Sequence, residues 1–463
     1  MASREYPLEP VEVPPVETAH RRICTPIPVP ESVEVLRALR AAEPRSMGGQ
    51  APVIWERGEG SQILDPYGNR WLDFSAGVLV TAAGHGHPRV SAAIEACLRS
   101  GVHHAYSFPT GVRARLAAKL RDLAPRPLEK VFLLTTGSEA TECCIKLART
   151  HGVRTGGARK RVFVTFDNAF HGRTMGAQLA GGSPSLKDWI GGADHGFVQV
   201  PFPDGFRQAD TSFAVFETSL AEQGVEPRDV CGVMAETYQG CNACLMPAAY
   251  ARALRAWCDS HGALMIFDEV QAGFGRTGRW FGFEHCGVVP DLAAFGKGIS
   301  GGMPLSSVIG SADVMDLYGP GEMTSTHSAN PLCCAAALAN IEVIEQERLV
   351  DNAARLEPLL LDGARRAQKA SQGRIGRVDG AGLVAALQFT HPGTTRPDPD
   401  TAFDAYRRAI ESGVMLFSPV GVGGCCIKMN PPLVITEEAL REGLDVIVEC
   451  VRKATAPRAS AAV

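Results

Sequence analysis

The sequence has no excess of positive charge and no long hydrophobic run. Lys and Arg together number 46 and Asp and Glu number 50, which gives a formal net charge of −4. A protein that holds nucleic acid or an anionic membrane by charge needs a basic excess, so neither partner is expected. Polar residues interrupt the apolar stretches well before the length of a bilayer-spanning helix, so no transmembrane segment is expected.

The sequence also lacks the features of an exported or metal-binding protein. Prolines and charged residues fill the first 30 residues, which therefore contain no apolar core of a secretory signal. We expect a cytoplasmic protein in which the 14 cysteines are reduced thiols. The single Cys-x-x-C, Cys241 to Cys244, has no second pair at zinc-finger spacing, so no metal site is expected.

What the sequence does contain is the pattern of an α/β protein. With 463 residues, 45% of them hydrophobic, the chain is too long for one compact core. After Gly101, short apolar strands alternate with helices, an order typical of a mostly parallel sheet covered on both faces. The strand candidates are 131–135, 162–166, 230–235, 263–267, 292–295 and 307–309.

Changes of pattern along the chain predict four segments. They are an extended Pro-rich arm over 1–30, the N-terminal part of a small domain over 31–100, a large α/β domain over 101–342, and the C-terminal part of the small domain over 343–463. Ligands bind at the carboxyl ends of the strands in open parallel sheets, so the strand ends of the large domain are where functional residues are expected.

The first two of these strand ends suit a phosphorylated ring. A helix opens at Gly137 and Ser138, where backbone N–H groups and a hydroxyl can bind phosphate. An ordinary capped helix is the alternative interpretation. The next loop contains Phe170 and Arg173, an aromatic for ring stacking and a cation for an anion. A surface loop with an aromatic anchor is the alternative there.

Two further strand ends carry an acid and a lysine. Asp268 follows a strongly apolar strand, and a buried carboxylate needs a cationic or proton-donating partner. Lys297 lies between two glycines at the end of another strand, an arrangement that suits a lysine reaching a carbonyl carbon. A phosphate cradle, a stacking ring, an acid and a lysine are together what pyridoxal 5′-phosphate requires. The lysine then serves as general base and acid at the substrate.

The chain resembles the class III aminotransferases among the fold-type I pyridoxal-phosphate enzymes, from about Asp65 to Thr436. This family includes 4-aminobutyrate, ornithine and acetylornithine aminotransferases. The resemblance implies a large domain with a mostly parallel, seven-stranded type of sheet and a smaller α/β domain from both termini. The motifs that carry it, in family order, are Gly84-His85-Gly86-His87-Pro88, Thr136-Gly137-Ser138-Glu139-Ala140, Phe170-His171-Gly172-Arg173, Asp268-Glu269-Val270-Gln271, Gly296-Lys297-Gly298, Ser325-Thr326, Asn330-Pro331-Leu332 and Pro431-Pro432-Leu433.

The resemblance assigns roles position by position. Lys297 forms the Schiff base with the cofactor, and Asp268 holds the pyridine nitrogen. Thr326 binds the phosphate of the neighbouring subunit, which implies a homodimer or a dimer of dimers. The remaining cofactor contacts that it implies are Gln271 at the ring hydroxyl, Phe170 stacked on the ring, and Gly137 and Ser138 at the phosphate.

The substrate residues depart from the family pattern in two places. The motif that opens with Glu236, counted here among the substrate contacts, ends in Cys241 where the family has Glu. Lys428 stands where the family has the Arg that binds an α-carboxylate. Arg173 is retained and is expected to bind a substrate carboxylate. The switch pair is therefore missing on both sides, which puts 2-oxoglutarate in doubt as the acceptor.

These residues lead to an expected reaction. Val78 is aliphatic, which argues mildly against ornithine as a substrate, and Tyr106 is expected to line the pocket from the partner chain. We expect amino transfer from an ω-amino acid or amine, such as 4-aminobutyrate or β-alanine, to a 2-oxo acid, with pyruvate preferred. An amino-acid racemase or epimerase and an amino-alcohol phospho-lyase share the cofactor residues and remain as alternatives.

Overall fold

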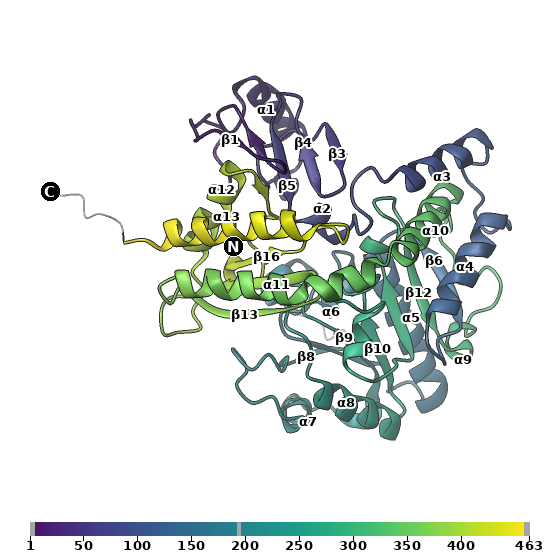
Figure 1. Cartoon of the computed structure of the whole chain (residues 1–463). Helices are drawn as coiled ribbons and strands as arrows, with labels where there is room; N and C mark the ends of the chain where they lie inside the picture. Colours follow the sequence, from purple (N-terminus) through teal and green to yellow (C-terminus); the bar gives the residue numbers. More distant parts are fainter. Residues whose placement is uncertain (1–4, 192–195, 458–463) are drawn as a thin grey trace. The chain divides into compact units, whose positions relative to one another are not determined.

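The computed structural model describes residues 5–191 and 196–457, and these residues form two compact units (Figure 1). The first unit holds the described residues of Met1–Leu79, Ala83–His87 and Ala354–Val463. The second holds those of Val80–Ala82 and Pro88–Ala353. The second unit thus starts before, and ends after, the large domain expected over 101–342. Residues 1–4 of the expected arm and 458–463 lie outside the described residues.

The second unit is built on a seven-stranded sheet in the order β6-β12-β11-β10-β9-β7-β8. Its strands are β6 (Lys130–Leu134), β7 (Val162–Phe166), β8 (Phe197–Val200), β9 (Val230–Glu236), β10 (Leu264–Asp268), β11 (Leu292–Phe295) and β12 (Ser306–Gly310). The pairs from β8 to β11 are parallel, and β12 pairs antiparallel with both of its neighbours. The mostly parallel α/β sheet is confirmed, while β8 was missed.

Helices surround this sheet, and three of them (α4, α5 and α10) begin at side-chain caps. α5 starts at Thr136, whose Oγ1 accepts the Glu139 N–H at 3.2 Å, while the Glu139 carboxylate accepts the Thr136 N–H. The side chain of Asn330 caps α10 in the same way. Figure 1 shows α3 and α10 side by side. The helices of this unit are α3 (Pro88–Arg99), α4 (Gly111–Leu123), α5 (Gly137–Gly156), α6 (Met175–Ala180), α7 (Ala214–Glu222), α8 (Ala248–His261), α9 (Ala312–Met315) and α10 (Pro331–Gln346).

The first unit contains two smaller sheets. One has the order β1-β2-β5-β4-β3, with β15 beside β5, and the other the order β13-β14-β16. The strands are β1 (Val16–Glu17), β2 (Arg22–Ile23), β3 (Arg57–Glu59), β4 (Gln62–Leu64), β5 (Arg70–Asp73), β13 (Ile375–Ala381), β14 (Val384–Phe389), β15 (Val414–Met415) and β16 (Cys426–Met429). The helices are α1 (Val33–Ala42), α2 (Ala76–Leu79), α12 (Pro399–Glu411) and α13 (Glu437–Thr455).

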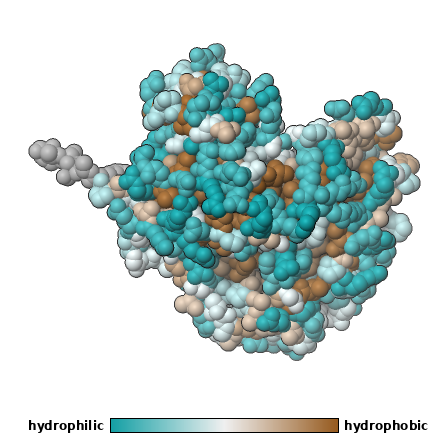
Figure 2. Space-filling model, in the orientation of Figure 1, coloured by the Kyte–Doolittle hydropathy of each residue, from teal (hydrophilic) through white to brown (hydrophobic). Residues whose placement is uncertain are grey.

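One further helix, α11 (Leu349–Ala370), begins in the second unit and continues through the first. Within the first unit it lies beside α13 (Figure 1). Ion pairs Arg355–Glu437 at 3.0 Å and Arg366–Asp445 at 2.8 Å join the two helices. Hydrophilic residues predominate over the visible face of both (Figure 2). Their opposite faces therefore provide the apolar side chains that pack inside this unit.

The N-terminal arm packs against the rest of the first unit. β2 pairs antiparallel with β5 at Arg22 and Arg70. Tyr6, Ile23 and Ile27 are buried, with at most 3% of their surface exposed. Apolar residues placed between the prolines bury surface against the unit, and this burial holds the extended segment down.

None of the helices in the described residues combines the length and the apolar composition that crossing a bilayer requires. All of the cysteines are free thiols, and most of them are buried.

Candidate active site

Adjacent strands of the second unit bring two acidic residues together. In the parallel pairing of β9 and β10, Asp268 lies opposite Glu236, each as the last residue of its strand. On the other side, Asp268 lies opposite Ala294 of β11, three residues before Lys297. The parallel strands end at the same edge, so the expected acid and the expected lysine emerge from neighbouring positions.

Asp268 forms a buried pair with His171. The Asp268 Oδ2 atom lies 2.7 Å from His171 Nδ1, and neither side chain has more than a few per cent of its surface exposed. Burial alone would lower the pKa of His171, but the hydrogen bond and the charge of Asp268 outweigh burial and raise it. The Val270 N–H donates to the other oxygen of Asp268 at 3.0 Å. Hydrogen bonds thus fix both oxygens of Asp268.

Lys297 opens the short helix η7 (Lys297–Ile299) after β11. Its backbone has a positive φ of 44°, which is unusual for a residue with a side chain. Burial lowers the pKa of its amine, and the charges on Asp268 and Glu236 offset part of that effect. A lowered pKa increases the fraction of neutral amine, the form that attacks a carbonyl carbon and accepts a proton.

Two glycines allow the segments of the site to approach one another closely. A Cβ on Gly137 would lie 3.0 Å from Val270 Cγ1, next to Asp268. Gly172 has a φ of 139°, and a Cβ there would overlap the Ser138 side chain. The first turn of α5 is therefore held against the β10 end and against the loop after β7. The Arg173 N–H also donates to Ser138 Oγ, at 3.4 Å.

Glu236 ties the loop after β7 to the end of β9. Its carboxylate is 4% exposed and accepts the N–H groups of Gly240 at 2.9 Å and of Phe170 at 3.2 Å. Burial raises the pKa of Glu236 to about 7, although His171 acts in the opposite direction. The contacts place Glu236 behind Phe170 as a positioning residue, and its expected substrate contact stays a prediction.

The raised pKa of Glu236 predicts a pH dependence of stability. A carboxyl whose pKa is higher in the folded state than its ordinary 4.5 stabilises the fold while it is protonated. This contribution is present below pH 4.5 and is lost as the pH rises toward the folded value of about 7. The expected loss is up to roughly 3 kcal/mol, at 1.36 kcal/mol per pKa unit.

Unfolding measured in urea between these two pH values checks this prediction. Glu236→Gln should flatten the dependence, since an amide does not titrate. Glu217→Gln, on the exposed surface of α7, is the matched control and should keep the parent slope. An unchanged slope in Glu236→Gln would contradict the assignment.

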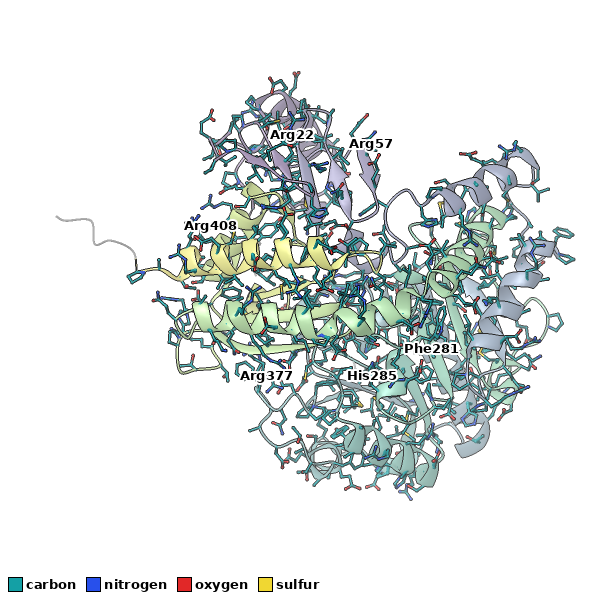
Figure 3. The ribbon with its side chains drawn as sticks, viewed as in Figure 1. Arg22, Arg57, Phe281, His285, Arg377 and Arg408 are labelled. Atoms are coloured by element: carbon teal, nitrogen blue, oxygen red, sulfur yellow. The ribbon has the colours of Figure 1, made fainter. Side chains whose placement is uncertain are left out.

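Glu269 is a second buried carboxylate, which the sequence did not single out. It is fully buried and accepts the N–H groups of Gly282 at 2.6 Å and Phe283 at 3.0 Å. Thr237 Oγ1 donates to it at 2.8 Å. Burial raises its pKa to about 7, and these hydrogen bonds act against that rise. Glu269 thus joins the ends of β9 and β10 to η6 (Gly282–His285). In Figure 3, the labels of Phe281 and His285 mark this segment.

The remaining expected ring contacts lie around the same strand ends. Phe170 is 40% exposed, and the Arg173 guanidinium lies 5.2 Å from the centre of its ring. Arg173 itself is exposed. The Gln271 side chain packs against Gly240, where a Cβ would overlap the amide. The backbone carbonyl of Gln271 accepts from the Tyr238 hydroxyl at 3.1 Å.

Two expected residues lie on the surface of the second unit. Thr326 is exposed in the loop before α10. Tyr106 is 36% exposed, and its hydroxyl lies 2.9 Å from Thr324 Oγ1. The structure therefore brings Tyr106 to the loop that contains Thr326. Their assignment to a neighbouring subunit stays a prediction.

The last expected substrate residues divide between the units. Val78 and Lys428 belong to the first unit, where Lys428 lies in β16 and is 5% exposed. Cys241 belongs to the second unit, partly buried, with its Sγ 3.7 Å from Gln239 Oε1. No group of three or more His, Cys, Asp or Glu side chains among the described residues is arranged to hold a metal ion.

Comparison with known proteins identifies consistent relatives. Residues 45–451 match the family described as aminotransferase class-III. A 4-aminobutyrate aminotransferase of Mycobacterium leprae is 35% identical over 440 residues, covering 92% of this chain and 97% of the relative. A 5-aminovalerate aminotransferase of Pseudomonas putida is 35% identical over 415 residues, covering 89% and 96%. The solved structure of a PLP-bound amine transaminase from an uncultivated Pseudomonas species superposes with a TM-score of 0.79 at 29% identity, covering 87% and 94%.

Proposed function

Because this chain belongs to the class III aminotransferases, fold-type I enzymes whose cofactor is pyridoxal 5′-phosphate, we propose that it transfers an amino group from an ω-amino acid to pyruvate. The resemblance in the sequence is confirmed, and relatives named for 4-aminobutyrate and 5-aminovalerate support an ω-amino acid as the donor. The observation that carries the proposal for the site is the emergence of Asp268 and Lys297 from neighbouring strand ends.

The residues of the second unit fit this cofactor. α5 begins at Gly137, which has no side chain, and backbone N–H groups at the start of a helix bind phosphate. Asp268 would hold the ring nitrogen, because its buried partner His171 orients its carboxylate. Lys297 would hold the aldehyde carbon. Phe170, Gln271 and Thr326 complete the proposed set.

The chemistry divides between the cofactor and the chain. When bound, pyridoxal phosphate supplies an electron-withdrawing ring that stabilises negative charge at the substrate carbon next to the amine. Lys297 would take the proton from that carbon and deliver a proton to the former aldehyde carbon of the cofactor, so that the amino group stays with the cofactor; its lowered amine pKa suits both transfers. His171 orients Asp268, and Glu236 holds the backbone of Phe170 in place.

Pyruvate is the proposed acceptor because of two substitutions. A dicarboxylic acceptor needs a cation at each end, for which Arg173 and Lys428 are the proposed residues. Lys428 is a point charge and does not make the two parallel hydrogen bonds of an arginine. Cys241 stands where glutamate-using members of the family have a Glu, the residue that pairs with the Arg at the position of Lys428. Pyruvate has a single carboxylate and needs only one cationic anchor. The two substitutions should therefore weaken its binding less than that of a dicarboxylic acceptor.

We expect pyruvate to exceed 2-oxoglutarate in kcat/KM by roughly tenfold, the value of one charge-assisted hydrogen bond. Lys428→Arg should restore part of the use of 2-oxoglutarate. Arg173→Ala should raise the KM for ω-amino acids by roughly tenfold, and that for simple amines far less. Steady-state kinetics with both acceptors and both donor classes check these values, with Arg173→Lys as the charge-preserving control. A parent that strongly prefers 2-oxoglutarate contradicts the proposal.

We also propose a homodimeric, cytoplasmic enzyme. Exposed apolar side chains cluster in sequence at the end of α3 and after it, at Leu98, Val102 and Phe108, the last of which is 73% exposed. Such a surface is suited to burial against a second copy. Free thiols throughout the chain are compatible with a reducing compartment. Sedimentation of the holoenzyme tests the dimer.

A further inference from the structure

Lys297 stands at the start of a tight turn with an unfavourable backbone conformation. Its φ of 44° lies in the left-handed region, which a residue with a side chain rarely adopts. Within the turn, the Ile299 N–H donates to the Gly296 carbonyl at 3.1 Å. The Ser300 N–H donates to the Lys297 carbonyl at 3.5 Å. Because such a conformation persists only where its surroundings fix it, the contacts around this turn control the direction of the Lys297 side chain.

A side chain of α10, Asn340, binds this turn directly. Its Nδ2 donates to the carbonyl of Gly298 at 2.9 Å and to that of Ile299 at 3.1 Å. These carbonyls belong to the first and second residues after Lys297. Asn340 is fully buried, on a helix that packs against η7. Its loss would remove a donor from two carbonyls in the interior, where a missing hydrogen bond is costly.

The end of the turn fits closely around the same amide. Gly301 has a φ of 65°, and a Cβ on it would lie 2.8 Å from Asn340 Oδ1. Among the described residues, Oδ1 has no hydrogen-bond partner, so the amide holds the turn through the two bonds that Nδ2 donates. Residues 298–301 therefore enclose the end of one side chain.

The direction of the Lys297 side chain matters for its proposed chemistry. The Lys297 amine is buried, and the charges of Asp268 and Glu236, at the ends of neighbouring strands, act on it. Asn340 and these three residues all belong to the second unit. An amine reacts fast with a carbon only from a short distance and at the correct angle, so a small shift of the backbone at Lys297 has a large effect.

We propose that Asn340 is a positioning residue, which holds the turn after Lys297 and so directs the Lys297 amine to the aldehyde carbon of the cofactor. In this proposal Asn340 contacts neither the cofactor nor the substrate and acts through the backbone of Gly298 and Ile299. The proposal rests on the proposed function, in which Lys297 bonds to the cofactor. It adds a residue of α10 that determines how well this lysine is placed.

Displacement of the cofactor from Lys297 by hydroxylamine tests this in the holoenzyme. Hydroxylamine attacks the carbon bonded to Lys297, its nitrogen replaces the lysine nitrogen there, and Lys297 leaves as a free amine. The hydroxylamine concentration that converts half of the bound cofactor, followed by absorption, therefore measures how well the amine is placed. Asn340→Leu keeps the approximate volume and removes both donated bonds. It should lower this concentration by roughly tenfold.

Steady-state kinetics provide a second readout. In Asn340→Leu, kcat should fall by roughly tenfold or more, since the same amine moves the proton, while the KM for 4-aminobutyrate should change by less than about twofold. Asn340→Asp keeps the shape and, because burial disfavours its charged form, one donor. It should give intermediate values in both measurements, and it replaces Asn340→Leu if that variant does not fold.

The control is Thr165→Val, which removes another buried hydrogen bond of the second unit. Thr165 is fully buried in β7, and its Oγ1 accepts from Gln199 Nε2 at 3.0 Å. This variant should lower the melting temperature and leave both readouts within about twofold of the parent. A hydroxylamine concentration in Asn340→Leu as high as in the parent overturns the proposal while the proposed function stands. A parent whose cofactor is not bonded to Lys297 overturns both.

Discussion

Lys297→Ala is expected to remain folded, to bind pyridoxal phosphate without a covalent bond, and to lose turnover by roughly 10⁴-fold or more. The physical reason is that one amine is proposed both to hold the cofactor and to move the proton at the substrate carbon. Its lowered pKa provides the neutral form that both tasks need. Steady-state turnover and cofactor content after gel filtration measure the two effects separately.

The matched control is Lys187→Ala. Lys187 is another lysine of the second unit whose amine has a pKa lowered by burial, and it donates to Gln199 and to the Leu179 carbonyl. Its hydrogen bonds go to Gln199 and Leu179, so its loss should leave turnover within a few-fold of the parent. Activity close to that of the parent in Lys297→Ala would show that another group carries the chemistry.

Asp268→Asn is expected to keep the cofactor and to lose roughly 10²- to 10³-fold in turnover, as when one preorganised electrostatic partner is removed. A neutral amide does not stabilise a protonated ring nitrogen. It also removes the charge that raises the pKa of His171. The His171 pKa, followed by NMR in the variant, should therefore fall, which a merely structural change elsewhere would not produce.

Asp291→Asn provides the comparison for Asp268→Asn. Asp291 precedes β11, pairs with Arg255 at 2.8 Å, and accepts the Met265 N–H at 2.7 Å. Its substitution should lower the free energy of unfolding with little change in turnover. A transamination rate in Asp268→Asn within a few-fold of the parent excludes Asp268 as the partner of the ring nitrogen.

Most of the large sheet could be predicted from the sequence, because its strands are short apolar runs buried on both faces. β9, β10, β11 and β12 are buried along their whole length. β8, at the edge of the sheet, is only partly buried, and its four residues carry no comparable signal. The packing of the N-terminal arm could not be predicted, because prolines separate the few apolar residues that anchor it.

The sequence also identified some residues of the candidate site and missed others. Asp268 and Lys297 could be named because their chemistry is unusual at the end of an apolar strand. Glu269 was missed, since its partners are backbone N–H groups of a segment beyond the strand, and the sequence does not show where these point. Such contacts depend on the tertiary fold and leave no local pattern.

A half-reaction without an acceptor distinguishes amino transfer from the alternative reactions. The holoenzyme is mixed with 4-aminobutyrate in the absence of an acceptor, and the aminated cofactor and the aldehyde product are quantified after denaturation. We expect one equivalent of each per subunit, followed by formation of alanine when pyruvate is added. An enzyme that leaves the cofactor unaminated with every ω-amino acid, and instead interconverts the enantiomers of an amino acid, would contradict it.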